Sequence, residues 1–192
     1  MKTTRPITLE RYRVTLRRLT LEDIEMLRRW RTDPRISQYM DFRGEITPEQ
    51  QRAWFDSLDP ECDFFFVIVV REKPIGMIEI KHIDWNKKVG EGGIFIYEQR
   101  YQNSIVPYCA LVSLLEFCFE DLELTAVEGS VLRDNERARR FAKSLGYEIL
   151  PDQERGENQR YCVTSASFEA AVGSIRARLR GGAAKSPEGA AR

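Results

Sequence analysis

Three side chains near the middle of the chain have the chemistry of a proton acceptor: Glu79, His82 and Glu91. A carboxylate or an imidazole beside a reacting amine can remove its proton, directly or through a water molecule. Each also has a structural explanation, because Glu79 can face solvent from a strand, His82 can complete a turn and Glu91 can guard a strand end. We predict that one of these three residues is the catalytic base.

A second chemical feature is the junction between a strand that ends at Tyr97 and a helix that begins near Ser104. The first amides of a helix have no partner within the helix and lie at the positive end of its dipole, so this junction suits a phosphate. Glycines normally let the backbone approach a pyrophosphate, but residues 100–105 read Arg-Tyr-Gln-Asn-Ser-Ile. Pro107 removes one more amide donor. An ordinary strand-to-helix turn is the alternative for this loop.

The third feature is the segment 133–147, which reads Arg-Asp-Asn-Glu-Arg-Ala-Arg-Arg-Phe-Ala-Lys-Ser-Leu-Gly-Tyr. Asn135 is a typical helix N-cap, and Gly146 is typical of the left-handed residue that closes a helix. Capping alone would explain Asn135.

The composition limits the class of protein. With 192 residues, 42% hydrophobic and 31% charged, the chain predicts one soluble domain. The longest apolar run, 64–70, is too short to cross a bilayer, and the start lacks the apolar stretch of a secretory signal. Four cysteines without a CxxC pair and a single histidine argue against a metal site or a disulfide framework and favour a reducing cytoplasm.

The charges are unevenly distributed although they sum to zero. Residues 1–35 carry ten basic and five acidic side chains, and residues 171–192 carry five and one. Aromatic residues do not alternate with these basic clusters, so solvated helix faces and a basic tail explain them better than a nucleic-acid surface. We expect neither a nucleic acid nor a membrane as partner.

The elements that must position these residues follow from periodicity and caps. Alternating or continuous apolar runs predict strands over 12–17, 64–70, 75–83, 90–97, 126–132 and 159–167. Capping signals and helical spacing predict helices from Thr20 to Asp33, from Thr47, over 104–120, over 135–145 and after 168. The expected fold is a single α/β (α+β) domain over residues 1–180, with a mixed central sheet flanked by helices, an antiparallel first half and a βαβ second half. Residues 181–192 are expected to be disordered.

Together, the segments 91–107 and 133–147 resemble the acetyl-coenzyme A half of the GNAT N-acetyltransferase superfamily. The family pattern over the second segment is D-N-x-x-A-x-x-x-Y-x-x-x-G-F/Y. The resemblance implies that Asn135 contacts the pantetheine arm and that a backbone amide of the strand polarises the thioester carbonyl. It also implies cofactor contacts along the strand and the loop, at Ile94, Phe95, Ile96, Arg100, Gln102, Asn103, Ser104 and Ile105.

One position departs from the pattern. In the family a tyrosine protonates the departing thiolate, and Ala142 stands at that position here. Water or another tyrosine, such as Tyr97, Tyr101 or Tyr108, is then expected to take this role.

The first half of the chain resembles bacterial GNAT enzymes that acetylate nucleotide-linked aminosugars, closest to the pseudaminic acid branch. The residues that carry this resemblance are Leu16–Asp23 and Trp30–Met40. For such an acceptor we predict an apolar shelf of Trp30, Tyr39 and Met40 for the base or the sugar ring, with Arg31 and Arg35 for the diphosphate. Core packing is the alternative for Trp30, and solubility for the arginines. Branches that modify ribosomal-protein termini or polyamines share much of this opening.

We therefore expect an acetyl-CoA-dependent N-acetyltransferase that transfers the acetyl group directly to a primary amine, without a metal or a covalent intermediate. The expected acceptor is a nucleotide-linked aminosugar, with a protein N-terminus or a polyamine as alternatives. A GNAT-fold protein that has lost catalysis and serves in binding or assembly is the rival, because both the loop glycines and the tyrosine are missing. The C-terminal helix either covers the edge of the sheet or makes a homodimer, which we favour.

Overall fold

The structure is a computed structural model that describes residues 7–39 and 44–182. Its centre is an eight-stranded sheet in the order β1-β2-β3-β4-β5-β6-β8-β7. The strands are β1 (Thr8–Arg11), β2 (Val14–Arg18), β3 (Phe64–Val70), β4 (Lys73–Asp84), β5 (Val89–Ile96), β6 (Ala126–Leu132), β7 (Glu148–Ile149) and β8 (Asn158–Thr164). The pair β5–β6 is parallel, and the other pairs are antiparallel, which confirms the expected mixed sheet.

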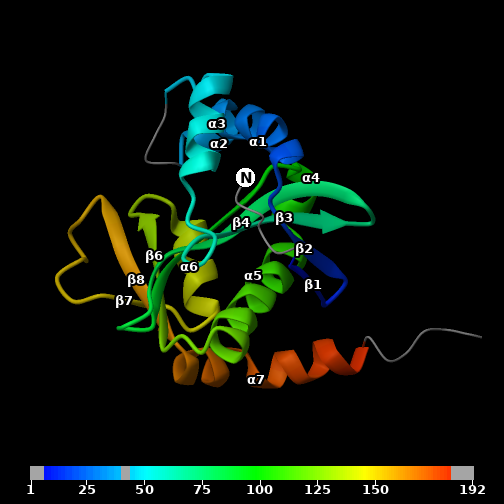
Figure 1. The fold of residues 1–192 in the computed structure, drawn as a ribbon. Helices are drawn as coiled ribbons and strands as arrows, with labels where there is room; N and C mark the ends of the chain where they lie inside the picture. The colour runs from blue at the N-terminus through cyan, green and yellow to red at the C-terminus, as the bar shows by residue number, and fades with distance from the viewer. Residues whose placement is uncertain (1–6, 40–43, 183–192) are drawn as a thin grey trace, which may run out of the picture.

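Helices cover both faces of this sheet (Figure 1). One face carries the 3-10 turn η1 (Leu21–Asp23) and the helices α1 (Ile24–Thr32), α2 (Pro34–Ser37) and α3 (Pro48–Ser57). The other carries α5 (Val106–Glu116), its π-helical continuation η2 (Phe117–Asp121) and α7 (Ser165–Gly182). The short α4 (Gln99–Gln102) leads into α5, and α6 (Glu136–Ser144) connects β6 to β7. In Figure 1 the first three helices lie above the sheet, and α5 and α7 lie below it.

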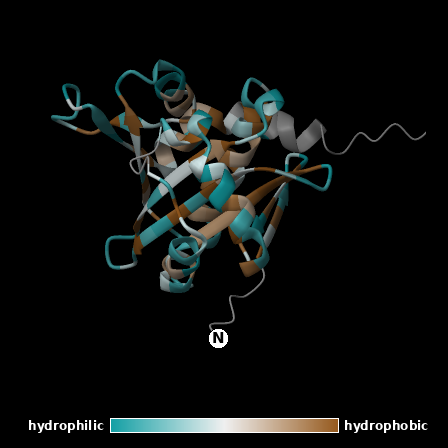
Figure 2. Cartoon of the chain, turned by 90° about the horizontal axis from the view of Figure 1, so that it is seen from above, coloured by the Kyte–Doolittle hydropathy of each residue, from teal (hydrophilic) through white to brown (hydrophobic). Residues whose placement is uncertain are grey.

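The sequence explains this layering. Every residue from Phe64 to Ile68 is buried, as expected for a continuous apolar strand that is covered on both faces. The even-numbered residues of β3 pack with α5 in the main core. The odd-numbered Phe65 and Val67, together with Met77 of β4, pack with Leu19 and Leu27 in a smaller core under α1 and α3. Hydrophobic colour accordingly gathers on the central strands, and hydrophilic colour on the peripheral loops (Figure 2).

Predicted caps begin several of these helices. Thr47 and Gln50 form a reciprocal capping box in front of α3, with Pro48 in the first turn. The Asn135 side chain accepts the Ala138 N–H at 3.1 Å at the start of α6. Gly146 closes α6 with a φ of 87°. Its backbone lies so close to Ser167 that an added Cβ would stand 2.4 Å from the Ser167 carbonyl oxygen.

Several sequence-based expectations need correction. The strand β1, the short helices α2 and α4 and the two-residue strand β7 were not predicted, because segments of two to four residues carry too little periodicity. The last strand ends at Thr164, since Thr164 and Ser167 bond reciprocally and start α7. The expected disorder from residue 181 is wrong for Gly181 and Gly182, which end α7, and residues 183–192 lie outside the described residues.

The α7 helix does not cover the edge of the sheet. That edge is occupied by β7, which pairs with β8. Phe168 and Val172 of α7 are buried, and the Phe168 ring contacts Phe119 at 5.7 Å between centroids. Phe168 and Val172 are therefore satisfied within the molecule, while Ile175 stays 41% exposed.

Candidate functional site

The sheet opens between β5 and β6. The two parallel strands pair over three residues each, from Val89 to Glu91 and from Ala126 to Glu128, and then diverge. Alternate residues of an antiparallel strand direct both backbone groups toward the same neighbour. The Tyr97 N–H donates to the Ile75 carbonyl at 2.9 Å. The backbone N–H and C=O groups of Tyr97, and of every second residue before it in β5, therefore point toward β4. Gly92, Ile94 and Ile96 consequently direct their backbone groups into the opening, which we call the fork.

Glycines line the fork. A Cβ on Gly92 would lie 3.0 Å from the Val127 side chain, and a Cβ on Gly129 would lie 3.4 Å from the Gly92 carbonyl oxygen. The two strands are therefore still in contact at Gly92 and Gly129, and the unpaired backbone edge of β5 begins beyond them. A slim group with its own amides can bond such an edge as an additional strand does.

Glu79 stands over the fork on the face of the sheet that α1–α3 cover. It pairs across β4–β5 with Gly93, and a Cβ on Gly93 would lie 2.5 Å from Glu79 Oε1. Burial raises the pKa of Glu79, while the positive charges of Lys81 and Arg31 oppose that rise. A carboxylate with a raised pKa is a better proton acceptor for an amine than an ordinary surface glutamate.

The other two predicted bases lie nearby but in a different environment. Glu91 pairs with Lys81, one step along the same face from the Glu79–Gly93 pair. His82 has a left-handed backbone (φ 51°) at the irregularity of β4, and its Nδ1 is 3.3 Å from Glu91 Oε2. Both side chains are more than half exposed. The structure thus brings Glu79 and Glu91 onto one face and joins His82 to Glu91.

The junction before α5 is partly satisfied by its own side chains. The Gln102 amide donates to the Ile96 carbonyl at 2.9 Å, and the Val106 N–H donates to Ser104 Oγ at 3.2 Å. Pro107 lies in the first turn without a donor. Asn103, Ser104 and Ile105 are exposed at this surface, as the sequence predicts, and Ile105 is 60% exposed. The helix start therefore offers fewer free amides than a glycine-rich loop does.

An arginine joins this junction to α6. Arg137 of α6 donates a hydrogen bond to the Gln102 carbonyl. Arg100 lies over the Tyr101 ring, 4.8 Å from its centroid, and its Nε is 3.8 Å from Glu98. Guanidinium groups have five donors each and suit phosphates. Two cations thus stand beside the segment whose backbone lacks glycine.

The residues predicted for an acceptor separate into core and surface. Trp30 is 7% exposed and stacks on Tyr97, with centroids 5.1 Å apart, so packing explains it. Tyr39 is 58% exposed, and Met40 lies outside the described residues. Arg35 is bound to Asp33 through several hydrogen bonds. The predicted apolar shelf of Trp30 with Tyr39 is therefore not formed by the described residues.

Arg31 instead lines a small hollow under α3. Its guanidinium lies 5.2 Å from the centroid of the Trp54 ring, and burial lowers its pKa, opposed by the charge of Glu79. The hollow has a volume of about 220 Å³ and is lined by Arg31, Ile46, Gln50, Gln51 and Trp54. Gln51 is 1% exposed, and neither its amide nitrogen nor its amide oxygen has a hydrogen-bond partner within the described residues. A buried amide without partners points to a missing ligand or water.

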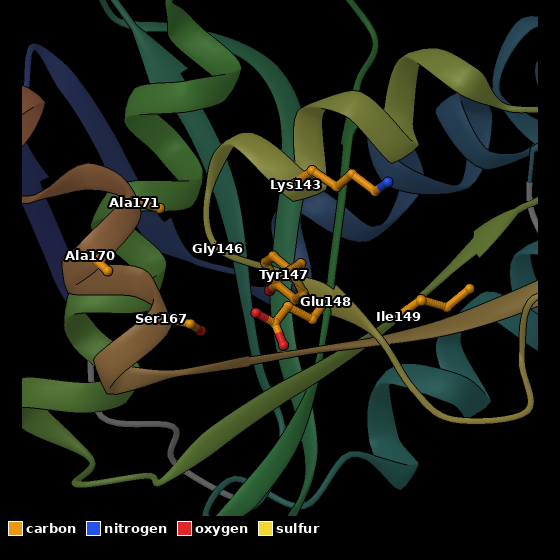
Figure 3. Close-up of a pocket in the computed structure, with 8 residues that line it drawn as sticks. All are labelled: Lys143, Gly146, Tyr147, Glu148, Ile149, Ser167, Ala170 and Ala171. Carbon is orange, nitrogen blue, oxygen red and sulfur yellow. The ribbon is translucent and has the colours of Figure 1, made fainter.

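A larger hollow of about 690 Å³ lies on the other face, between the end of α6 and α7. In Figure 3, Ser167, Ala170 and Ala171 stand on one side of it and Lys143 and Ile149 on the other, with Tyr147 and Glu148 between them. None of the fork glycines lines it. Size alone therefore does not make it the reaction site.

Other kinds of site are not found in the described part of the chain. Residues 7–39 and 44–182 contain no group of three histidine, cysteine or acidic side chains that could hold a metal ion. Within the same ranges, no helix has the length and apolar character needed to span a bilayer.

Sequence reasoning missed two features of the site. Gln51 was assigned to no site, and Arg137 was not expected near the loop. Side-chain burial and proximity across the chain reveal these residues, and neither is encoded in local spacing.

The comparisons with known proteins agree with this geometry. Residues 13–148 match the acetyltransferase (GNAT) domain family. The uncharacterized N-acetyltransferase p20 of Bacillus licheniformis is 25% identical over 161 residues, which span 79% of this chain and 90% of p20.

Two solved structures share the fold at low identity. The spermidine N-acetyltransferase of Vibrio cholerae, in complex with CoA and spermine, has a TM-score of 0.72 at 18% identity and covers 81% of this chain and 98% of its own. FdhC, a nucleotide-linked sugar GNAT in its apo form, has a TM-score of 0.74 at 17% identity and covers 90% of this chain and 98% of its own.

Proposed function

Because this chain belongs to the acetyltransferase (GNAT) family, we propose that it transfers an acetyl group from acetyl-CoA to the primary amine of a nucleotide-linked aminosugar. Membership of the family and the relation to an N-acetyltransferase make the protein an acyltransferase. The acyl donor and the acceptor are the new parts of this proposal.

The observation that carries the proposal is the glycine-lined fork with Glu79 beside it. The strands stop pairing at Glu91 and Glu128, and Glu79 Oε1 occupies the space above Gly93. A thioester held in the fork and an amine above the sheet would meet at this point. The pantetheine arm of acetyl-CoA carries amides that can bond the backbone edge of β5 at Ile94, between Gly92 and the Ile96 carbonyl that accepts from Gln102.

The chemistry needs a neutral amine and a polarised carbonyl. The amine attacks the thioester carbon, and Glu79 accepts the proton that the nitrogen loses, directly or through water. The backbone N–H of Ile94 is directed into the fork and is the donor we assign to the developing oxyanion. Glu91 and His82, which are exposed, are the residues we assign to relay that proton to solvent.

At the anionic end of acetyl-CoA, we propose that side chains make part of the pyrophosphate contacts that a glycine-rich loop normally makes through its backbone. We assign Arg100, Gln102, Asn103, Ser104 and Ile105 to the surface that contacts the pyrophosphate, with Phe95 supporting the strand. The Arg137 guanidinium lies within reach of this surface. Asn135 caps α6 through its side-chain oxygen, which leaves its amide N–H groups for the pantetheine arm.

The charge of the acceptor hollow favours a sugar nucleotide over a polyamine. Arg31 is its charged lining residue, and a cation repels a polycationic acceptor but attracts a diphosphate. The unpartnered Gln51 amide offers its two N–H donors and its carbonyl acceptor to a base edge or a hydroxyl. Likeness to both a spermidine and a sugar-nucleotide enzyme does not decide between these acceptors, because each likeness is below 20% identity.

Titration calorimetry with acetyl-CoA and CoA tests the donor, and a thiol-release assay with nucleotide-linked aminosugars, peptide amines and polyamines tests the acceptor. We expect micromolar binding and turnover with the sugar nucleotides. In Arg31→Met the KM of the sugar nucleotide should rise at least tenfold, while the affinity for CoA stays the same. Turnover restricted to polyamines or peptides would overturn the acceptor, and absence of CoA binding would favour a binding or assembly protein.

A further inference from the structure

The acceptor hollow under α3 contains two polar side chains whose bonding capacity is unused. Gln51 is 1% exposed, and both polar atoms of its amide lack a hydrogen-bond partner. Arg31 lines the same hollow and makes no hydrogen bond or ion pair within residues 7–39 and 44–182. Enclosed polar groups without partners lower stability, so both side chains point to a ligand.

Arg31 differs in this respect from the other arginines of α1 and α2. Each of the others has a carboxylate partner at an N···O distance of 2.6–2.9 Å, in the pairs Arg28–Glu25, Arg29–Glu25 and Arg35–Asp33. Arg31 lies instead over the Trp54 ring, where burial lowers its pKa although an arginine keeps its charge. A half-buried cation without a carboxylate partner favours the binding of an external anion.

The lining of the hollow is rich in donors. The Arg31 guanidinium has five N–H groups and the Gln51 amide has two, against a single amide carbonyl oxygen. This set suits an oxyanion, whose oxygens only accept, better than an ammonium group. The volume of about 220 Å³ is below the range of about 300–1,000 Å³ that holds a whole drug-sized ligand. The hollow therefore suits one phosphate or carboxylate with part of the group that carries it.

The register of the sheet sets the distance from this hollow to the reacting groups. Trp54 lies edge-on to Phe65, with ring centroids 5.0 Å apart. Phe65 pairs with Glu79 across β3–β4, and Glu79 pairs with Gly93 across β4–β5. Because neighbouring strands are about 4.8 Å apart, Phe65 lies one strand from the proposed base and two strands, or about 10 Å, from the fork. An acceptor anchored in the hollow must span this distance with the group that joins its anion to its amine.

We propose that Arg31 and Gln51 form an oxyanion subsite that binds the sugar-linked phosphate of the acceptor and selects amines across the sugar ring from that phosphate. The subsite rests on the proposed function and assigns one part of its acceptor. The guanidinium and the amide N–H groups donate to the phosphate oxygens, and the Gln51 carbonyl accepts from a hydroxyl of the acceptor. An amine on the carbon next to the phosphate-bearing carbon is held short of the fork, whereas an amine on the far side of the ring reaches Glu79.

The first test measures binding without turnover. Calorimetric titration of inorganic phosphate into the CoA-saturated protein reports the subsite, because CoA then occupies its own anion site. We expect one phosphate site whose affinity falls about tenfold or more in Arg31→Met, as for hydrogen bonds to a charged group. Arg52→Met is the matched control, since Arg52 pairs with Asp56 on the exposed side of α3 and its loss should leave phosphate binding unchanged. Equal affinities in Arg31→Met and Arg52→Met, or no phosphate binding at all, would overturn the subsite.

The second test measures selection among acceptors. Aminohexose phosphates with the amine beside the phosphate-bearing carbon or across the ring are compared, each with its phosphate-free counterpart. In the unmodified protein the phosphate should lower the KM of the far amine about tenfold or more, and this ratio should approach one in Arg31→Met and fall in Gln51→Leu. A merely structural role of these residues would raise both KM values and leave the ratio unchanged, which would overturn the assignment. Preference for the neighbouring amine would also overturn it.

The two proposals fail in different ways. If CoA does not bind, the proposed acetyl transfer is overturned, and phosphate titration without CoA still judges the subsite. If an Arg31-dependent gain is found only with the carboxylate of peptide amines, both the sugar acceptor and its phosphate are overturned. If sugar nucleotides are acetylated but the phosphate ratio is one, the subsite alone is overturned.

Discussion

The Glu79 carboxylate has room above the sheet because its cross-strand partner is a glycine. Gly93 leaves the space that Glu79 Oε1 occupies, and α1 and α3 exclude much of the solvent from that face. The same enclosure makes the ionised carboxylate costly. A buried carboxylate that can serve as a base therefore lowers the stability of the folded protein, as is common at reaction sites.

Replacing Glu79 by glutamine separates these two effects. We expect Glu79→Gln to lower kcat about 100-fold, because the amine proton loses its acceptor. The folded pKa of Glu79 is raised, so the native state binds its proton more tightly than the unfolded chain does. Stability then falls as the pH rises from the unfolded pKa through the folded one. Glu79→Gln should therefore be at least as stable at pH 7, and its advantage should shrink toward pH 4.

Melting curves from pH 4 to pH 8 and initial rates at each pH check this prediction. In the unmodified protein the acidic limb of the rate profile should lie above the ordinary glutamate range. If Glu91→Gln rather than Glu79→Gln removes that limb, Glu91 is the base.

Gln51 is buried although neither polar atom of its side chain has a hydrogen-bond partner among the described residues. Replacing it by leucine removes two unpaired polar atoms, so we expect Gln51→Leu to raise the free energy of unfolding by about 1–2 kcal/mol. If the amide binds the acceptor, the KM of the acceptor should rise about tenfold at the same time. Urea unfolding and steady-state rates measure both effects. Arg52→Ala, on the exposed side of the same helix, is the control that should change neither.

At the level of the elements, Gly93 and Gly146 are needed for different reasons. A Cβ on Gly93 would meet the mobile end of Glu79, whereas a Cβ on Gly146 would meet the Ser167 backbone at a positive φ. Gly93→Ala should lower kcat about 10- to 100-fold by displacing the base, with a stability change within about 1 kcal/mol. Gly146→Ala should lower the free energy of unfolding by about 2–4 kcal/mol. Equal losses of stability would contradict this division.

A buried carboxylate joins three elements that are distant in sequence. Glu116 at the end of α5 is fully buried and accepts hydrogen bonds from Arg11 of β1 at 3.0 Å and from the Tyr12 hydroxyl. It also forms an ion pair with Arg176 of α7 at 3.5 Å. Arg176 also reaches Glu120 and Glu169. This network holds the N-terminal hairpin and the last helix against the end of α5.

Removing that carboxylate leaves cations beside an apolar core. We expect Glu116→Ala to lower the free energy of unfolding by about 3 kcal/mol, because the partners of a buried ion pair lose their compensation. Asp56→Ala, which breaks an exposed pair with Arg52, should cost less than about 1 kcal/mol. Urea denaturation of both variants gives the comparison. A loss in Glu116→Ala no larger than in Asp56→Ala would show that the network contributes little.

On the scale of the whole molecule, the proposed reaction places the acceptor and the cofactor arm on different sides of the sheet. The acceptor hollow and Glu79 lie under α1–α3, and Tyr147, α5 and α6 lie on or beside the other face. The fork is the place where the two sides communicate.

The homodimer remains a prediction. Ile175 of α7 and Trp85 after β4 are large apolar side chains that stay 41% and 43% exposed. If α7 makes the contact, Ile175→Glu should convert the dimer to a monomer without loss of its own fold. Light scattering over a range of concentrations measures the mass. A monomeric mass of the unmodified protein at all concentrations would contradict the prediction.

The sequence by itself determined the fold class, most of the longer elements and the helix caps. Their signals are local: the apolar run of β3, the capping box of Thr47 and the asparagine before α6 each act within a few residues. The glycine-free loop and Ala142 were also visible, since they are positions in a linear motif. Short elements such as β1, α2 and β7 were not, because their few residues are held by contacts with distant parts of the chain.

The tertiary structure decided which chemical groups meet. Glu79 became the favoured base because Gly93 faces it across two strands, whereas periodicity left three bases open. Trp30 became a core residue because Tyr97 stacks on it, and Gln51 entered the proposed acceptor hollow because its buried amide has no partner among the described residues. Register, crossover and burial are properties of long-range pairing. Local spacing places a residue on a face of its own element, and packing alone determines what that face meets.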